Sequence, residues 1–145
     1  MNAATAAPAR TGTAVGDLAR WSVPTVEPEA HLAAAAYLLH RSGCSALVVE
    51  PEPEGEPVAL LGVADISRAV AAGRDPERTR VADIATRRPG TVDAGVAADV
   101  AARAMVEGGW QHLLVRDGRQ VGVVDLADVA GWLLNAPAGG RGREP

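Results

Sequence analysis

The feature that most constrains the fold of this chain is an internal repeat. Leu61–Ala72 reads L-G-V-A-D-I-S-R-A-V-A-A, and Val121–Trp132 reads V-G-V-V-D-L-A-D-V-A-G-W. In each stretch an apolar run reaches an aspartate, and apolar residues then resume at helical spacing. That pattern predicts a strand that runs directly into a helix. Because the junction occurs twice in one short chain, it indicates a fold built from two copies of one unit.

The first part of the unit repeats at a constant offset in residue number. Val15–Leu18 matches Val81–Ile84 at an offset of 66, and Thr25-Val26 matches Thr91-Val92 at the same offset. These matches lie well before the junctions, so the repeat extends over most of the chain.

The junctions themselves align at a smaller offset. Gly62 matches Gly122, which gives an offset of 60. The fall from 66 to 60 gives repeat one six extra residues between Glu50 and Leu61. A change of length confined to a hairpin connection is what a surface loop tolerates.

Each repeat is predicted to fold as β-α-β-β-α, which makes the chain an α+β (mixed α/β) protein whose two tandem units pack into a pseudo-twofold module. The elements predicted for repeat one are a strand over Trp21–Val26, a helix from Pro28 to Arg41, strands over Ser45–Val49 and Val58–Ala64, and a helix from Asp65 to Gly73. Those predicted for repeat two are a strand ending at Thr91-Val92, a helix capped by Asp93 and reaching Glu107, strands over Trp110–Val115 and Gln120–Val124 flanking the Asp117-Gly118 turn, and a helix over Asp125–Leu134. The apolar stripes of the two long helices are Leu32, Ala35, Ala36 and Leu39, and Val96, Val100, Ala104 and Met105.

Domain boundaries follow from the repeats. Repeat one spans residues 15–72, a charged linker spans 73–80, and repeat two spans 81–134. Residues 1–14 and 135–145 offer little apolar surface to bury and are predicted to be disordered tails.

Composition excludes several classes of protein. With 145 residues the chain can bury a core, and its net charge of −4 argues against a nucleic-acid surface. The longest nearly uncharged apolar run, Ala30–Leu39, is too short to span a bilayer, so we expect no membrane insertion. Without a secretory signal pattern the chain is expected to be cytoplasmic, and the single Cys44 excludes an intrachain disulfide.

The duplicated order of elements resembles a known family. Two β-α-β-β-α units, each with a V-x-D-[LI] lead-in, a strand ending in Thr-Val and a G-V-x-D junction, are similar to a pair of CBS domains, named after cystathionine β-synthase and often called a Bateman module. The resemblance covers about residues 15–134. It implies a regulatory module, not an enzyme, that senses an adenine-containing ligand such as AMP, ADP, ATP or S-adenosylmethionine in a cleft between the repeats. It also implies that no cofactor is required, that the chain forms a homodimer, and that a regulated protein is either fused to it or separate.

The resemblance assigns residues to a ligand site in repeat two. In the family the base lies near the Thr-Val strand, the last aspartate of the junction accepts from the ribose hydroxyls, and a Ser or Thr at the start of the junction helps to hold phosphate. The candidate residues are Thr91, Val92, His112, Gly122, Val123, Asp125 and Asp128. Asp128 takes the ribose position, where a carboxylate accepts charge-assisted hydrogen bonds.

Repeat one is predicted to be the weaker site. Its equivalents are Thr25, Val26, Gly62, Val63, Asp65 and Arg68. At an offset of 60 Arg68 falls on the ribose position, and a guanidinium cannot accept a hydrogen bond. Asp65 and Asp125 then replace the Ser or Thr, and their charge should repel phosphate. Adenosine, AMP or S-adenosylmethionine at repeat two is therefore the favoured ligand.

Structural roles for the same residues remain open. Asp65 and Asp125 are good helix caps, and Asp125-x-x-Asp128 resembles a capping box. A ligand-free dimerisation or scaffold module that regulates a separate protein is therefore the alternative function. No metal site is expected, because His31, His40 and His112 lack ligand spacing, and Cys44 has no partner spaced to activate it. Trp110 and Trp132 either mark an interface or fill the core.

Overall fold

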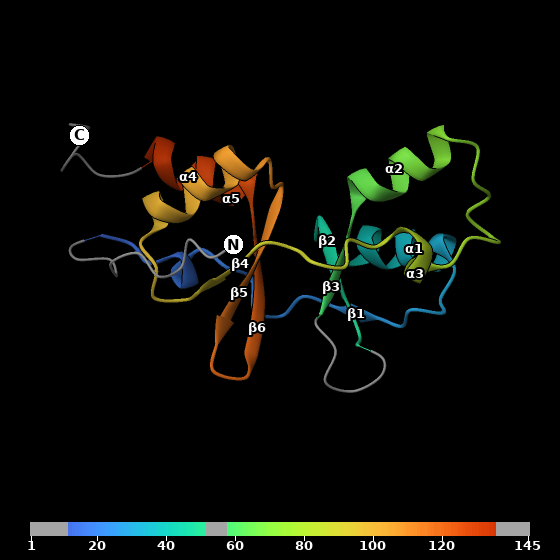
Figure 1. The fold of residues 1–145 in the computed structure, drawn as a ribbon, viewed down its shortest axis with the longest axis horizontal. Coiled ribbons are helices and arrows are strands. Elements are labelled where there is room, and N and C mark those ends of the chain that lie inside the picture. Colours follow the sequence, from blue (N-terminus) through green and yellow to red (C-terminus); the bar gives the residue numbers. More distant parts are fainter. Residues whose placement is uncertain (1–11, 52–57, 136–145) are drawn as a thin grey trace. The chain divides into compact units, whose positions relative to one another are not determined.

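The computed structural model describes residues 12–51 and 58–135, which form two compact units (Figure 1). Unit 1 combines the described residues up to Trp21 with those from Gly90 onward, and unit 2 runs from Ser22 to Pro89. The predicted tails lie mostly outside the described residues. Within the described part of the chain, no helix is both long enough and apolar enough to cross a membrane.

Unit 2 is a three-stranded sheet with three helices. Its elements are β1 (Thr25–Val26), α1 (Leu32–Ser42), β2 (Ala46–Val49), β3 (Ala59–Gly62), α2 (Val63–Ala71) and α3 (Val81–Ile84). The strand order is β1-β2-β3, with β1 parallel and β3 antiparallel to the central β2. All four residues of β2 are buried, as expected for the central strand of a small covered sheet.

Unit 1 has the same topology. Its elements are the 3₁₀ turn η2 (Val15–Asp17), β4 (Thr91–Asp93), α4 (Ala98–Gly108), β5 (His112–Asp117), β6 (Gln120–Asp125) and α5 (Leu126–Asn135). The strand order β4-β5-β6 again has a parallel and then an antiparallel pair, and the predicted hairpin turn at Asp117-Gly118 joins β5 to β6. The predicted α+β class and the β-α-β-β-α order are confirmed.

The compact units do not coincide with the sequence repeats. The lead-in segment of repeat one (residues 15–21) belongs to unit 1, and that of repeat two (residues 81–87) belongs to unit 2. Val15 belongs to repeat one, yet its N–H donates to the carbonyl of Val96 in unit 1 at 2.7 Å. Val81 belongs to repeat two, and its N–H donates to the carbonyl of Ala30 in unit 2 at 2.8 Å. Both valines are fully buried.

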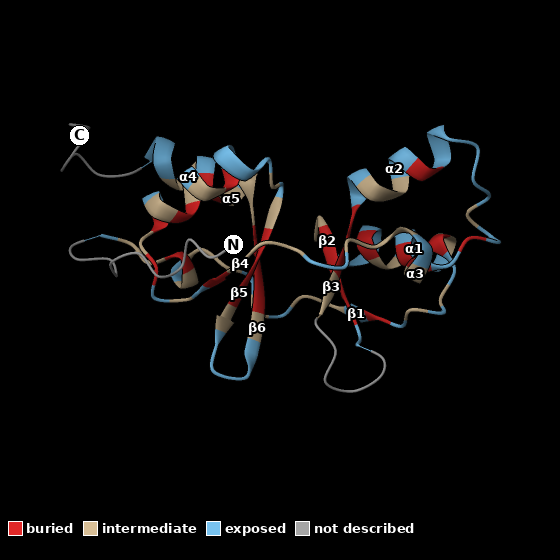
Figure 2. Cartoon of the chain, in the orientation of Figure 1, coloured by how far each residue is buried: buried red, intermediate tan, exposed pale blue. Residues whose placement is uncertain are grey.

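Aliphatic side chains form a separate core in each unit. Figure 2 shows the buried positions in red along the strands and on parts of the helices. Leu47 and Leu61 in unit 2 are fully buried, and Leu113 and Val124 in unit 1 are nearly or fully so. Trp110 and Trp132 are partly buried and pack against the core of unit 1, as core filling predicts. The other role predicted for them, at an interface, stays a prediction.

Two predicted helix starts are wrong, because backbone pairing overrides the capping signals. The helix expected from Pro28 begins at Leu32, whose N–H donates to the carbonyl of Thr79 at 2.9 Å. Asp93 does not cap α4, because it belongs to β4 and pairs with Arg116. Of the predicted stripe of α1, Ala36 faces out, and in α4 Ala98 and Ala101 are buried where Val100 and Ala104 are only partly so.

The register of the strands corrects the alignment of the two junctions. Ala46 pairs with Gly62 in unit 2, and its equivalent at the offset of 66, His112, pairs with Asp125 in unit 1. Gly62 is therefore equivalent to Asp125, which corresponds to an offset of 63, and the predicted offset of 60 is wrong. It follows that Asp65 is the equivalent of Asp128, and that Arg68 is not.

Gly131 in α5 offers a simple test of the local helix. A Cβ at this position would meet nothing within 4 Å, so Gly131→Ala should raise the free energy of unfolding by about 0.5–1 kcal/mol. Urea denaturation followed by tryptophan fluorescence measures the change. The contrasting variant is Gly109→Ala, which should destabilise because Gly109 has a φ of +70°. A loss of stability in Gly131→Ala would contradict the helical packing described for α5.

Candidate functional site

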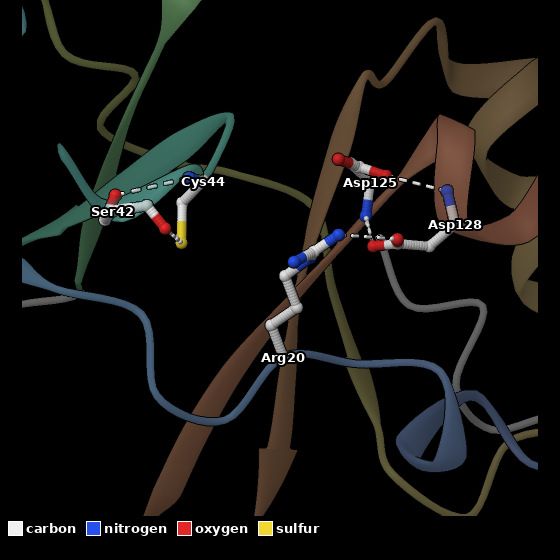
Figure 3. Close-up of polar contacts among 5 residues, drawn as sticks. All are labelled: Arg20, Ser42, Cys44, Asp125 and Asp128. Atoms are coloured by element: carbon white, nitrogen blue, oxygen red, sulfur yellow. Dashed lines mark hydrogen bonds and ion pairs between the residues drawn. The ribbon is translucent and has the colours of Figure 1, made fainter. Parts of the chain in front are cut away.

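The junction of β6 and α5 in unit 1 is closed by two reciprocal hydrogen bonds (Figure 3). The N–H of Asp128 donates to Oδ1 of Asp125 at 2.7 Å, and the N–H of Asp125 donates to Oδ2 of Asp128 at 3.2 Å. This is the predicted capping box with aspartate in place of glutamate. Both carboxylates therefore have a structural role, and a carboxylate oxygen can accept more than one hydrogen bond.

A basic side chain from the lead-in segment reaches the same junction. Nη2 of Arg20 donates to Oδ1 of Asp128 at 3.3 Å (Figure 3), although the two residues lie near opposite ends of the sequence. The Arg20 side chain is 53% exposed and that of Asp128 is 19% exposed. An ion pair this accessible to water contributes between 0 and about 1 kcal/mol, so it can exchange partners at low cost.

Backbone contacts fix the lead-in segment beside β6. Arg20 and Val123 exchange two backbone hydrogen bonds, of 2.8 and 3.0 Å, in an antiparallel bridge. Trp21 covers Gly122 so closely that a Cβ there would lie 2.8 Å from its ring and 2.9 Å from the carbonyl oxygen of Arg20. The indole N–H of Trp21 donates to the carbonyl of Gly16 at 3.1 Å. Gly122 thus makes room for the protein's own chain.

The remaining candidates of repeat two lie on neighbouring strands. Thr91 is half-buried on β4, and His112 starts β5 directly opposite Asp125. Val92 and Val123 are only 2% and 5% exposed, and both backbone groups of Val123 are bonded to Arg20, so these two valines present little surface to a ligand. The structure thus gathers Asp125, Asp128 and His112 at one end of the sheet of unit 1.

The equivalent junction of unit 2 carries one carboxylate instead of two. The N–H of Gly62 donates to Oδ2 of Asp65 at 2.8 Å, which repeats the contact between Asp125 and Asp128. Arg68 donates to Oδ1 of Asp65 at 2.7 Å from the next turn of α2. Asp65 therefore sits inside the first turn of α2 and does not open it as predicted.

The other candidates of repeat one are spread between the core and the surface. Val26 belongs to the core of unit 2, Thr25 donates its hydroxyl to Glu50 at 3.1 Å, and Val63 is exposed at the start of α2. Of the candidates of repeat one, Gly62, Asp65 and Arg68 are therefore brought together by hydrogen bonds at the junction.

Among the described residues, no group of three or more His, Cys, Asp or Glu side chains could hold a metal ion. The thiol of Cys44, in unit 2, contacts the carbonyl of Ser42 at 3.9 Å (Figure 3) and lines an apolar pocket of about 250 Å³ between α1 and α2. At the unit 1 junction, carboxylates that accept hydrogen bonds lie beside a half-exposed guanidinium, so this junction offers both acceptors and donors to a polar ligand.

Sequence reasoning did not find Arg20 and Trp21. Their place in the site depends on pairing between segments far apart in the chain, to which no local pattern points. The signal available in the sequence was Gly122 on an otherwise apolar strand, since a strand glycine often marks the close approach of another backbone.

Comparison with known proteins assigns the chain to a family. A family model described as the CBS domain matches residues 15–72 and again 81–135. The chain therefore belongs to the CBS-domain family and contains a tandem pair, as its sequence suggested. A CBS pair is a regulatory module.

Individual relatives agree with this assignment. The chain is 27% identical over 118 residues to the uncharacterized protein MK0525 of Methanopyrus kandleri, and the match covers 79% of this chain and 60% of that protein. The chain thus spans less than two thirds of that relative. The hexameric CBS-CP12 protein from bloom-forming cyanobacteria superposes with a TM-score of 0.80 at 21% identity, covering 94% of this chain and 79% of that one. The CBS domain protein PAE2072 from Pyrobaculum aerophilum, complexed with AMP, superposes with a TM-score of 0.68 at 22% identity, covering 79% and 88%.

Proposed function

We propose that this chain is a regulatory sensor of adenine nucleosides or nucleotides and holds the ribose hydroxyls on Asp128 and Asp65. The observation that carries the proposal is a pair of equivalent carboxylates. Asp65 is the third residue of α2, and Asp128 is the third residue of α5. Each is fixed by a backbone hydrogen bond and largely shielded from water, with 19% and 16% of the side chain exposed. A carboxylate held in this way is preorganised to accept from two vicinal hydroxyls.

The corrected register changes the expected balance between the sites. Because Asp65 is the equivalent of Asp128, repeat one has a carboxylate at the ribose position. The offset of 60 had placed Arg68 there instead. The position of Asp125, where family members carry Ser or Thr, is Gly62 in repeat one and adds no charge there. Two like charges at ~4 Å repel by about 4 kcal/mol at an effective dielectric near 20. We therefore expect the junction of unit 2 to repel a phosphate less than the two carboxylates of unit 1 would without Arg20.

The binding of AMP by PAE2072 supports the ligand class. A thermal-shift screen against adenosine, AMP, ADP, ATP and S-adenosylmethionine tests it in this chain. A ligand at 100 times its Kd should add about 2.7 kcal/mol of stability, a shift of several degrees for a domain of this size. If none of the five shifts the melting temperature at millimolar concentration, the sensor proposal is wrong for this class of ligand.

Aspartate variants locate the sites. Asp128→Asn and Asp65→Asn each keep an oxygen that can accept the capping hydrogen bond but remove the charge, and the double variant should lose the ligand-induced shift. Asp17→Asn is the matched control, because Asp17 also accepts a hydrogen bond from the backbone N–H three residues before it, that of Ala14 at 3.2 Å, at the start of η2. A double variant that retains the full shift would place the ligand elsewhere.

A second function, the ligand-free dimerisation or scaffold module, is favoured by one observation. Large apolar side chains are exposed on the helices of both units: Tyr37, Val63 and Val70 in unit 2, and Val106, Leu133 and Leu134 in unit 1. The proposed homodimer, and any separate regulated protein, would cover such surface. Sedimentation of wild type against Val106→Lys and Leu134→Lys tests it, and an unchanged mass in both variants would exclude these residues from the dimer interface.

A further inference from the structure

We propose that Arg20 determines the specificity of the unit 1 site and selects a nucleoside that carries an anionic group, such as a 5′-monophosphate. This inference rests on the proposed function, because it concerns the same junction. It adds a residue that comes from outside the junction and a reason for that residue to be basic.

The position of Arg20 is set by the backbone, while its guanidinium can turn. The two hydrogen bonds with Val123 and the packing of Trp21 over Gly122 hold the Arg20 backbone against β6. The side chain is half exposed, so it can leave the carboxylate of Asp128 without unpacking any core. The carboxylate is kept at the junction by the N–H of Asp125, which donates to its other oxygen at 3.2 Å.

The charges around the junction give this movement a function. Asp125 and Asp128 carry two negative charges, and Arg20 offsets one of them. A diol on Asp128 can use acceptor capacity that Arg20 does not need, since each carboxylate oxygen has two lone pairs. A phosphate on the same ribose would lie close to these carboxylates, and a cation beside it would offset their repulsion. The planar guanidinium has five donors and suits a phosphate in two-point contact.

Unit 2 provides the internal comparison. The residue that pairs across β3 in the place of Arg20 is Thr86, which exchanges backbone hydrogen bonds of 3.0 and 2.8 Å with Leu60. Thr86 carries no charge, and the junction beside it has Gly62 in place of Asp125. The cation from the lead-in thus occurs in the unit whose junction has the additional carboxylate.

The test compares two ligands that differ only by phosphate. In the Asp65→Asn background, which removes the unit 2 site, titration calorimetry measures the Kd of adenosine and of AMP with and without Arg20→Gln. We expect Arg20→Gln to weaken AMP about 10-fold or more, the usual effect of losing a hydrogen bond to a charged group, and to change adenosine less than about 3-fold. Arg119→Gln, at the exposed end of the β5–β6 hairpin, is the matched control and should change neither.

The other outcomes separate the two proposals. Equal weakening of both ligands, or tightening of both, would overturn the specificity role while leaving nucleoside binding intact. Binding that persists in the parent protein but disappears in the Asp65→Asn background would show that unit 1 is not a site, and would overturn this inference alone. Absence of binding by the unmodified chain would overturn both.

Discussion

Replacement of Leu113 by alanine is expected to lower the free energy of unfolding of unit 1 by about 3–5 kcal/mol, the range for a buried leucine whose cavity does not collapse. Leu113 is 2% exposed and lies on β5, the central strand of its sheet. Because β5 is paired with β4 on one side and with β6 on the other, the residues around Leu113 have little freedom to close the gap. A loss of this size is a large part of the stability of a typical domain.

Tryptophan fluorescence during urea denaturation measures this effect selectively. The three tryptophans of the chain, Trp21, Trp110 and Trp132, all pack against the core of unit 1. Glu107→Ala is the control, because Glu107 is exposed on α4 and its loss should cost less than about 0.5 kcal/mol. A change below about 1 kcal/mol for Leu113→Ala would show that β5 is not the centre of this core.

The order of the elements could be predicted because local signals specify it. Asp117-Gly118 between two apolar runs marks a hairpin, and Gly43 and Gly109 follow the last residues of α1 and α4 in the left-handed conformation that ends a helix. These signals act within a few residues, so a single sequence contains them completely.

The register could not be predicted, because two glycines in the same local sequence have different structural roles. Gly62 and Gly122 both precede a V-x-D triplet, which suggested an offset of 60. Gly122 lies within β6 under Trp21, whereas Gly62 ends β3 and leads into α2. Only the pairing across each hairpin shows that Gly62 is equivalent to Asp125. A shift of three positions in one strand moved the ribose-binding candidate of repeat one from Asp65 to Arg68.

The lead-in contacts were invisible for a related reason. Arg20 reaches Asp128 because its segment packs on the unit formed by the other repeat, and pairing at that distance leaves no periodic pattern. The sequence contains one sign of this contact, which is Gly122, because a side chain at that position would collide with the lead-in segment where it crosses β6.

Replacement of Gly122 by alanine is therefore expected to disturb stability and ligand choice together. The new Cβ would lie 2.9 Å from the carbonyl oxygen of Arg20 and 2.8 Å from the ring of Trp21, both closer than real contacts allow. Relief requires the lead-in to move away from β6, which should cost about 1–3 kcal/mol in the free energy of unfolding. Because the same movement carries the guanidinium of Arg20 away from Asp128, the preference for AMP over adenosine should fall as it does in Arg20→Gln.

Denaturation and calorimetry on the same protein separate the two effects. The matched control is Gly131→Ala in α5, where a Cβ meets nothing and the helix should gain stability. If Gly122→Ala is destabilised but keeps the full preference for AMP in the Asp65→Asn background, then the position of the lead-in does not control Arg20, and the guanidinium finds the phosphate without the bridge to Val123. If stability and the preference for AMP fall together, the lead-in segment couples the packing of unit 1 to the charge of the ligand that unit 1 selects. The reason is that the absence of a side chain at Gly122 makes room both for Trp21 and for the backbone of Arg20 beside it.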